Sequence, residues 1–283
     1  MDTSRTLNML PEDCISTIVS LTSPPDACRL MLASSSLRSA AESDIVWGRF
    51  LPHDLLNILS RSHMTTQLNF SSKKDLYFQL CDSILIDGGI RRFCLNKVSG
   101  KKCCVLSARA LNISLSNEPN HWTWTTHSTS RFSEVVVLKT ISNVEIEGII
   151  NTEDLSSNTT YDAYLVIKVS DRSFGLDSIP SETSVTTTDS SVTNTTYLCP
   201  QDNKKQQLEA LFFMNRRQLM EKRAVKGEGR RPISREDGWM EIELGEFFGG
   251  EKSEVVKMKL TEVKGHQQKG GLTIEGIEVR PKC

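Results

Sequence analysis

The chain has 283 residues, of which 38% are hydrophobic and 24% charged, and its formal net charge is −1. This length accommodates one small module and one medium domain, and the ordinary composition excludes a chain that is disordered throughout. A net charge so close to zero gives no long-range field to attract nucleic acid or an anionic membrane, so we expect neither of them as a partner.

Residues 1–10 are polar and lack the apolar stretch of a secretory signal. Apolar runs such as Val135–Leu138 are far below the roughly 20 residues that cross a bilayer. We therefore expect a soluble protein of the cytoplasm, the nucleus or both. The 8 cysteines are scattered, without a CxxC pair or a histidine at zinc spacing. We interpret them as reduced thiols and expect no metal and no cofactor.

The first predicted element is a short helix that follows Leu10–Asp13. Its apolar residues recur at the spacing of one helix face, namely Ile15, Ile18, Val19 and Leu21. We expect Asp13 to cap this helix, because its carboxylate can accept a free amide of the first turn. Thr22–Pro25 ends the helix, since proline lacks an amide donor and disfavours helix in the residue before it.

Three more short helices are predicted before Pro52. The second begins at Asp26, the third covers Leu37–Ala41, and the fourth follows Ser43–Trp47. A module of about 45 residues buries too small a fraction of its surface to be comfortably stable alone. Its apolar face is therefore expected to need a partner.

The segment from Leu10 to Pro52 resembles the plant F-box in the version found in phloem protein 2-like proteins. The residues that carry the resemblance are Leu10–Asp13, Ser23–Leu30 and Val46–Trp47. Ala33 stands where the family usually has a valine, and we expect the lost methyl groups to weaken docking modestly. We assign residues 8–53 to this F-box.

The resemblance implies docking onto the linker subunit of an SCF ubiquitin ligase and, through that subunit, onto a cullin. The residues that match the apolar docking positions of the F-box pattern are Leu10, Pro11, Ile15, Ile18, Leu21, Leu30, Leu32, Leu37 and Trp47. In the alternative interpretation several of these residues form only the core of the module itself. Leu37 and Trp47 are the first candidates for that role.

Residues 54–100 are mixed in character, with an amphipathic stretch at Lys73–Leu80 and a turn at Asp87–Gly89. We interpret them as a connecting segment that packs against both of its neighbours.

Strand signals dominate residues 101–283. The segments that are rich in β-branched residues and alternate apolar with polar positions are Arg131–Thr140, Val144–Ile150, Ala163–Val169, Trp239–Leu244, Val255–Val263 and Leu272–Val279. Regularly spaced strands with Gly, Asn and Asp turns between them indicate an antiparallel β-sandwich. The predicted fold class is therefore α+β, a small helical module followed by a β-sandwich.

Residues 177–235 are predicted to form a flexible insertion in this sandwich. Ser181–Thr196 is rich in Ser and Thr and poor in apolar residues, so we expect a disordered loop there. Gln206–Arg223 has the apolar spacing of a helix. The insertion also contains basic pairs at 216–217, 222–223 and 230–231. We favour a solvated helix face for them over a role in nuclear import or in binding an acidic partner.

The C-terminal part also resembles a known family. The strings SARALNISLSNEPNHWTW, NTTYDAYLVIKV, REDGWMEIELGEFF and GGLTIEGIEVRPK are similar, in this order, to the phloem protein 2 or Nictaba-like lectin domain. The resemblance implies a β-sandwich that binds carbohydrate, commonly N-acetylglucosamine oligomers or the core of N-linked glycans. A glycan or glycoprotein client is therefore expected.

Trp122 and Trp124 could provide the aromatic ring that stacks on the apolar face of a sugar. Only one of the two is expected to meet a ligand. From the residues alone a core role is favoured for both. The resemblance favours binding by Trp122, whose position matches a sugar-binding tryptophan of the Nictaba-like lectins.

The second binding tryptophan of those lectins corresponds to Leu115 in this chain. Leucine has no ring to stack on a sugar, so about 0.5–1.5 kcal/mol of aromatic contact would be missing. This substitution argues against binding of chitin oligomers. It leaves two alternatives open, a different glycan or a protein surface.

No catalytic motif is recognised in the sequence. The 5 histidines lie outside the known nucleophile patterns, and Glu241 and Glu243 are interpreted as a solvated strand face. We therefore expect a non-catalytic adaptor of a ubiquitin ligase. The alternative is a carbohydrate-binding lectin without a ligase role.

Overall fold

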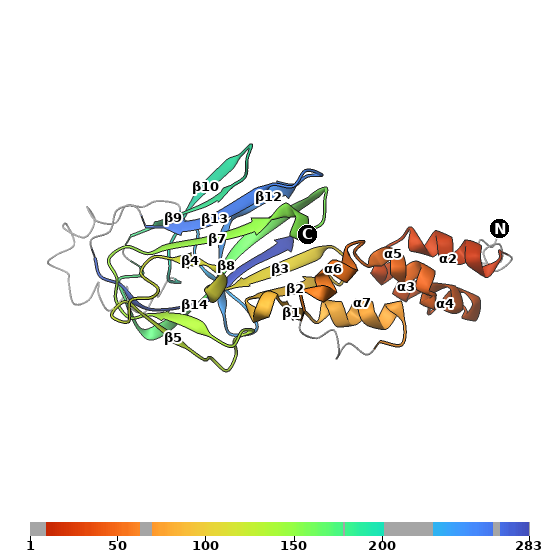
Figure 1. The fold of residues 1–283 in the computed structure, drawn as a ribbon, viewed down its shortest axis with the longest axis horizontal. Helices are drawn as coiled ribbons and strands as arrows, with labels where there is room; N and C mark the ends of the chain where they lie inside the picture. Colours follow the sequence, from red (N-terminus) through yellow and green to blue (C-terminus); the bar gives the residue numbers. More distant parts are fainter. Residues whose placement is uncertain (1–9, 63–69, 178, 201–228, 263–266, 283) are drawn as a thin grey trace, which may run out of the picture. The chain divides into compact units, whose positions relative to one another are not determined.

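The computed structural model describes the chain apart from residues 1–9, 63–69, 178, 201–228, 263–266 and 283. The chain divides into two units. The first comprises the residues up to Val105 together with Asp154–Ser156, and the second comprises Leu106–Glu153 and Ser157–Lys282. Helices come first and antiparallel strands follow, which confirms the predicted fold class (Figure 1).

The first unit is mainly helical. Its helices are α2 (Glu12–Ser20), α3 (Pro24–Leu30), α4 (Ser35–Glu42), α5 (Asp44–Phe50), α6 (Leu55–Ser60) and α7 (Lys73–Cys81). The strands β1 (Ile84–Ile86) and β2 (Arg91–Leu95) then form an antiparallel pair, and β3 (Lys102–Ser107) leads into the second unit.

Serine side chains begin three of these helices. The hydroxyls of Ser23, Ser34 and Ser72 accept hydrogen bonds from backbone amides of the first turns of α3, α4 and α7. The prediction that Asp13 caps the first helix is wrong. Pro11 is the N-cap residue of α2, no side chain caps it, and Asp13 already lies in the first turn. A carboxylate there still interacts favourably with the helix dipole.

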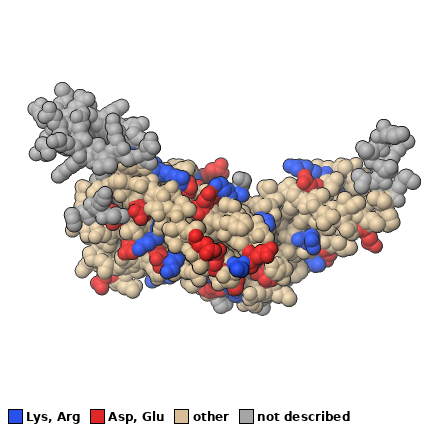
Figure 2. All heavy atoms as spheres, turned by 90° about the horizontal axis from the view of Figure 1, so that it is seen from above, with Lys and Arg blue, Asp and Glu red and all other residues tan. Residues whose placement is uncertain are grey.

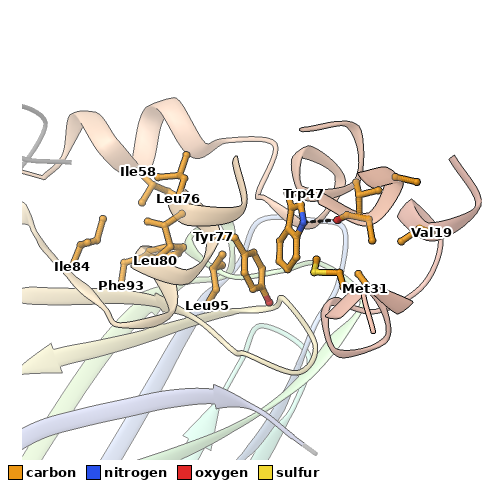
Figure 3. Close-up of a cluster of buried hydrophobic side chains, with 14 of the residues drawn as sticks. Val19, Met31, Trp47, Ile58, Leu76, Tyr77, Leu80, Ile84, Phe93 and Leu95 are labelled. Carbon is orange, nitrogen blue, oxygen red and sulfur yellow. Dashed lines mark hydrogen bonds between the residues drawn. The ribbon is translucent and has the colours of Figure 1, made fainter. Parts of the chain in front are cut away.

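A cluster of buried side chains runs through the described part of the first unit (Figure 3). Val19, Met31 and Trp47 come from the N-terminal helices, and the remaining labelled side chains are Ile58, Leu76, Tyr77, Leu80, Ile84, Phe93 and Leu95. The indole N–H of Trp47 donates a 2.8 Å hydrogen bond to the carbonyl oxygen of Ala41. The segment predicted as a connection therefore supplies much of the core on which the N-terminal helices rest.

Ion pairs bring Asp154 into the first unit. Its carboxylate lies 2.5 Å from a guanidinium nitrogen of Arg61 and 3.0 Å from one of Arg91. Arg61 also pairs with Asp87 at 2.7 Å. This guanidinium keeps the pKa of Asp87 below its usual value, against the opposing effect of partial burial.

The second unit consists of strands. They are β4 (Asn112–Ile113), β5 (Trp122–Thr125), β6 (Val135–Leu138), β7 (Glu145–Asn151), β8 (Thr159–Phe174), β9 (Ser181–Thr186), β10 (Ser191–Thr196), β11 (Ile233–Ser234), β12 (Met240–Gly249), β13 (Val255–Thr261) and β14 (Gly270–Pro281). Each predicted strand overlaps one of these, and β8 is longer than its apolar stretch indicated.

Two antiparallel sheets result (Figure 1). In one sheet β14, β8, β12 and β11 are consecutive neighbours, and the β5–β6 pair adjoins β14. The other has the order β10-β9-β13-β7-β4. The register of β14 shifts between Ile274 and Gly276, where a Cβ atom on Gly276 would lie 1.9 Å from the carbonyl oxygen of Leu106. Only glycine fits at this position.

The expected disordered loop at Ser181–Thr196 is instead the hairpin of β9 and β10, and that prediction is wrong. Ser181, Thr183 and Val185 are buried on one face of β9, and the strand pairs with β13. Period-two alternation and β-branched side chains stabilise the hairpin although few of its residues are apolar. The predicted helix at Gln206–Arg223 lies outside the described residues.

Candidate functional site

A row of exposed side chains runs along one side of α2. Pro11, Cys14, Ile18 and Leu21 follow one another at intervals of three or four residues, which places them on a common helix face. The side chains of Ile18 and Leu21 are 45% and 73% exposed. We call these four residues the docking stripe. Cys14 was not among the predicted docking residues, although its spacing within the row would have revealed it.

The opposite side of α2 holds the stripe in place. Ile15 and Val19 are 2% and 1% exposed and belong to the core of the first unit. The buried hydroxyl of Ser16 donates a 3.1 Å hydrogen bond to the carbonyl oxygen of Ala40 on α4. Helix α2 also packs against α5. The stripe thus lies on a helix with a fixed orientation, as a docking surface requires.

The predicted docking residues divide into three groups. The exposed ones are Leu10, Pro11, Ile18, Leu21 and Leu32. Leu30 and Leu37 are partly buried and pack against the core, whereas Ile15 and Trp47 are core residues. Isolated exposed apolar residues are common on protein surfaces, but an ordered row on one helix is a feature of interaction sites.

The two tryptophans of β5 anchor a turn in the second unit. The indole N–H of Trp122 donates a 3.0 Å hydrogen bond to the carbonyl oxygen of Ser114, and that of Trp124 donates one of 3.0 Å to Ser116. Within the turn the amide of Glu118 donates to the carbonyl oxygen of Leu115 at 2.9 Å. We call Ser114–Glu118 the Leu115 turn.

The residue between the two anchored carbonyls is Leu115. Its backbone has φ of 59°, in the left-handed region, and its side chain is 51% exposed. Residues other than glycine, asparagine and aspartate rarely adopt this backbone conformation.

The ring faces of the two tryptophans are only partly available. Trp122 is 2% exposed, so its ring packs within the unit, and its predicted stacking on a sugar stays a prediction. Trp124 is partly exposed, and the guanidinium of Arg109 lies 3.6 Å from the centroid of its ring. Arg109 in turn pairs with Glu134 at 2.8 Å. Sequence reasoning missed both charged residues, since neither belongs to a local motif.

Glu241 is not the solvated strand residue that was predicted. It is 8% exposed, and its carboxylate lies 2.8 Å from the guanidinium of Arg280 and 3.2 Å from that of Arg235. Glu278 pairs with Arg131 at 2.7 Å and with Arg235 at 3.0 Å. Its burial favours a raised pKa, but the two guanidinium groups outweigh burial and lower the pKa of Glu278 below its usual 4.5.

This ionic network explains Glu241 on β12 and Glu278 on β14 as structural residues. Both carboxylates have guanidinium partners, which is the arrangement that makes burial of charge tolerable. Within the part of the chain that the structure describes, no three His, Cys, Asp or Glu side chains gather as a metal site would need. No described helix is both long and apolar enough to span a membrane.

Acidic and basic side chains lie close to one another on the face drawn in Figure 2. Over the described residues of that face neither sign covers a broad area. A local surface, rather than a charged field, must therefore select a partner on this face.

Comparison with known families assigns a model to each part of the chain. The F-box domain model matches residues 7–49, and the phloem protein 2 model matches residues 101–281. The Arabidopsis thaliana F-box protein VBF is 49% identical over 280 residues, which are 97% of this chain and 99% of that protein. The F-box protein PP2-B15 of the same plant is 49% identical over 281 residues, 97% of this chain and 96% of its own.

Solved structures show a weaker likeness. The match to a family 35 carbohydrate-binding module from Clostridium thermocellum covers 62% of this chain and 96% of the module, with a TM-score of 0.31 and 10% sequence identity. The match to a Podospora anserina mannanase with such a module covers 64% of this chain and 28% of the mannanase, with a TM-score of 0.32 and 9% sequence identity. Scores of this size do not establish a shared fold.

Proposed function

Because this chain belongs to the family of F-box proteins with a phloem protein 2 domain, we propose that it is the substrate-recognition subunit of an SCF-type ubiquitin ligase. Its F-box would bind the linker subunit and, through it, a cullin. The second unit would bind a protein or glycoprotein client. The observation that supports this proposal most is the docking stripe, an ordered row of exposed apolar side chains within the F-box range.

The energetics of the stripe favour docking. Complete burial of a Leu or Ile side chain stabilises a complex by about 1.5–3 kcal/mol relative to full exposure. Ile18 and Leu21 still expose apolar surface that a partner can bury, whereas Ile15 and Val19 are already buried in the core of the first unit. A partner that covers the stripe gains this free energy without disturbing the fold of α2.

The proposed role needs no chemistry from this chain. A scaffold that holds a client beside a ubiquitin-bearing partner raises their effective concentration, and transfer then follows without a catalytic group from the adaptor. The proposal places the chain in the cytoplasm, the nucleus or both, where its ligase partners would act.

A lectin without a ligase role is the alternative. It would use the same β-domain, with Trp122 as the stacking ring and Leu115 at the neighbouring position. For Trp122 to stack on a sugar, its ring would first have to become exposed, because it is 2% exposed here. Glycan-array binding by the wild type and by Trp122→Ala and Leu115→Trp discriminates the two functions. Affinity that rises in Leu115→Trp would support the lectin.

The ligase role is tested by reconstitution from purified components. We expect the full chain, the linker subunit and the cullin to elute together in size-exclusion chromatography. When the linker subunit is omitted, the chain and the cullin should elute apart. A wild-type chain that elutes apart from the linker subunit contradicts the proposal. Glycan binding by such a chain would establish the lectin instead.

A further inference from the structure

Three polar side chains are buried together in the interior of the second unit. Ser181 and Thr183 on β9 are 1% and 0% exposed, and Glu262, directly after β13, is 5% exposed. Among the described residues, the two hydroxyl oxygens and both carboxylate oxygens have no hydrogen-bond partner. We propose that these three side chains form a site that binds ordered water inside the second unit. This inference does not depend on the proposed function.

Strand pairing brings the three side chains together. β9 and β13 are antiparallel neighbours, and Thr261 lies opposite Glu182 (Figure 1). The next step of this register places Glu262 opposite Ser181. The amide of Glu262 still donates a 3.0 Å hydrogen bond to the carbonyl oxygen of Val144, so the pairing extends to this residue. Opposite side chains on one face of a sheet have Cβ atoms about 4.5–5.5 Å apart, a separation that one water molecule can bridge.

Lys269 offsets the charge of Glu262 but does not satisfy its oxygens. The ammonium nitrogen of Lys269, a residue that is 1% exposed, lies 2.6 Å from Oε1 of Glu262. This contact lacks the angles of a hydrogen bond. The ammonium group instead donates to the carbonyl oxygens of Ser142 at 3.1 Å and Gln267 at 2.9 Å. The carboxylate therefore still needs donors, and the adjacent ammonium group would repel a metal cation.

Water matches the hydrogen-bonding chemistry of the site. A carboxylate only accepts hydrogen bonds, whereas a hydroxyl group both donates and accepts, and water can serve both kinds of group. Buried polar groups in folded proteins are bound by protein groups or by ordered water, because an unpaired one is costly. A buried water typically makes about three hydrogen bonds to groups that have no other partner. Glu262, Ser181 and Thr183 provide such a set.

A high-resolution crystal structure of the full-length wild-type chain tests the site directly. We expect a water oxygen within hydrogen-bonding distance of the carboxylate of Glu262 and of the hydroxyl of Ser181 or Thr183. Two results would overturn the inference. One is a site without electron density between these side chains. The other is density with the coordination distances of a metal ion.

The sign of a stability change provides a second test, measured by urea denaturation of the full-length chain. Valine has the shape of threonine without its hydroxyl group. If water binds Thr183, Thr183→Val removes one of the hydrogen bonds of that water, and the equilibrium constant for unfolding should rise about fivefold. If the hydroxyl of Thr183 has no partner, the same variant loses only an unpaired polar group, and the constant should fall.

Thr193→Val on the neighbouring strand β10 is the matched control, because its hydroxyl group is exposed to solvent. It should leave the equilibrium constant for unfolding close to that of the wild type. A Thr183→Val chain that is as stable as the wild type, or more stable, would overturn the role of Thr183 in binding water.

Discussion

The rings of Trp47 and Tyr77 lie with their centroids 5.3 Å apart, one on α5 and the other on α7. Trp47 belongs to the F-box range, and Tyr77 belongs to the segment that follows it. Both are 0% exposed. The hydroxyl of Tyr77 donates a 3.2 Å hydrogen bond to the carbonyl oxygen of Asn96. The docking stripe therefore depends on a core that extends well beyond the F-box.

Tyr77→Ala should destabilise the F-box helices although it lies outside them. Truncating a buried aromatic ring costs about 3–5 kcal/mol, because contacts are lost and a cavity remains. We expect the free energy of unfolding of the first unit to fall by that amount, measured by urea denaturation with circular dichroism. Phe78→Ala, whose ring is 37% exposed, is the control and should cost less. F-box helices that keep their wild-type stability in Tyr77→Ala would contradict a shared core.

Much of the fold could be predicted from local patterns. Apolar spacing located α2, and β-branched alternation located β7, β8, β12, β13 and β14. The hairpin of β9 and β10 was missed because its stability depends on pairing with β13, which is distant in the sequence. Aspartate is a common N-cap residue, which is why Asp13 was predicted to cap the first helix. The helix begins at Glu12, however, so Asp13 lies inside the first turn.

In the candidate site, too, only the features that depend on local sequence could be predicted. The row from Pro11 to Leu21 is a local pattern, so most of the docking stripe could be predicted. Sequence alone did not separate Ile15, which is buried, from Ile18, which is exposed, since that depends on which helices pack against α2. The pairing of Arg109 with Glu134 joins residues 25 positions apart and has no local signature.

Glu278→Gln should reduce stability at neutral pH and have less effect in acid. The pKa of Glu278 is lowered in the folded state, so its charge stabilises the fold above the unfolded pKa of about 4.5. This contribution disappears as the pH falls through the lower, folded pKa. Loss of charge-assisted hydrogen bonds to Arg131 and Arg235 should cost about 1–3 kcal/mol at pH 7.

Urea unfolding at pH 7 and at about pH 3 measures this difference. Glu182→Gln is the control, because that carboxylate is exposed on β9, and it should change little at either pH. A stability difference between Glu278→Gln and the wild type that stays constant or grows in acid would contradict the assigned direction of the pKa.

Leu115→Asn should make the second unit more stable. Asparagine adopts the left-handed backbone with less strain than leucine, so we expect the free energy of unfolding to rise by about 1 kcal/mol. Leu32→Asn is the matched control, because Leu32 is 83% exposed and is not among the residues with positive φ. It should show no such gain. A loss of stability in Leu115→Asn would mean that the leucine side chain packs usefully in the fold.

The affinity of the purified full-length chain for the linker subunit, measured by isothermal titration calorimetry, tests the ligase role most directly. Ile18→Asp places a charge in the middle of the docking stripe and should weaken binding at least a hundredfold, about 2.7 kcal/mol. Ile90→Asp carries the same change on a comparably exposed residue of the first unit, 41% against 45%, and should bind like the wild type. Circular dichroism should show both variants folded. Equal affinities of Ile18→Asp and the wild type for the linker subunit would contradict docking through α2.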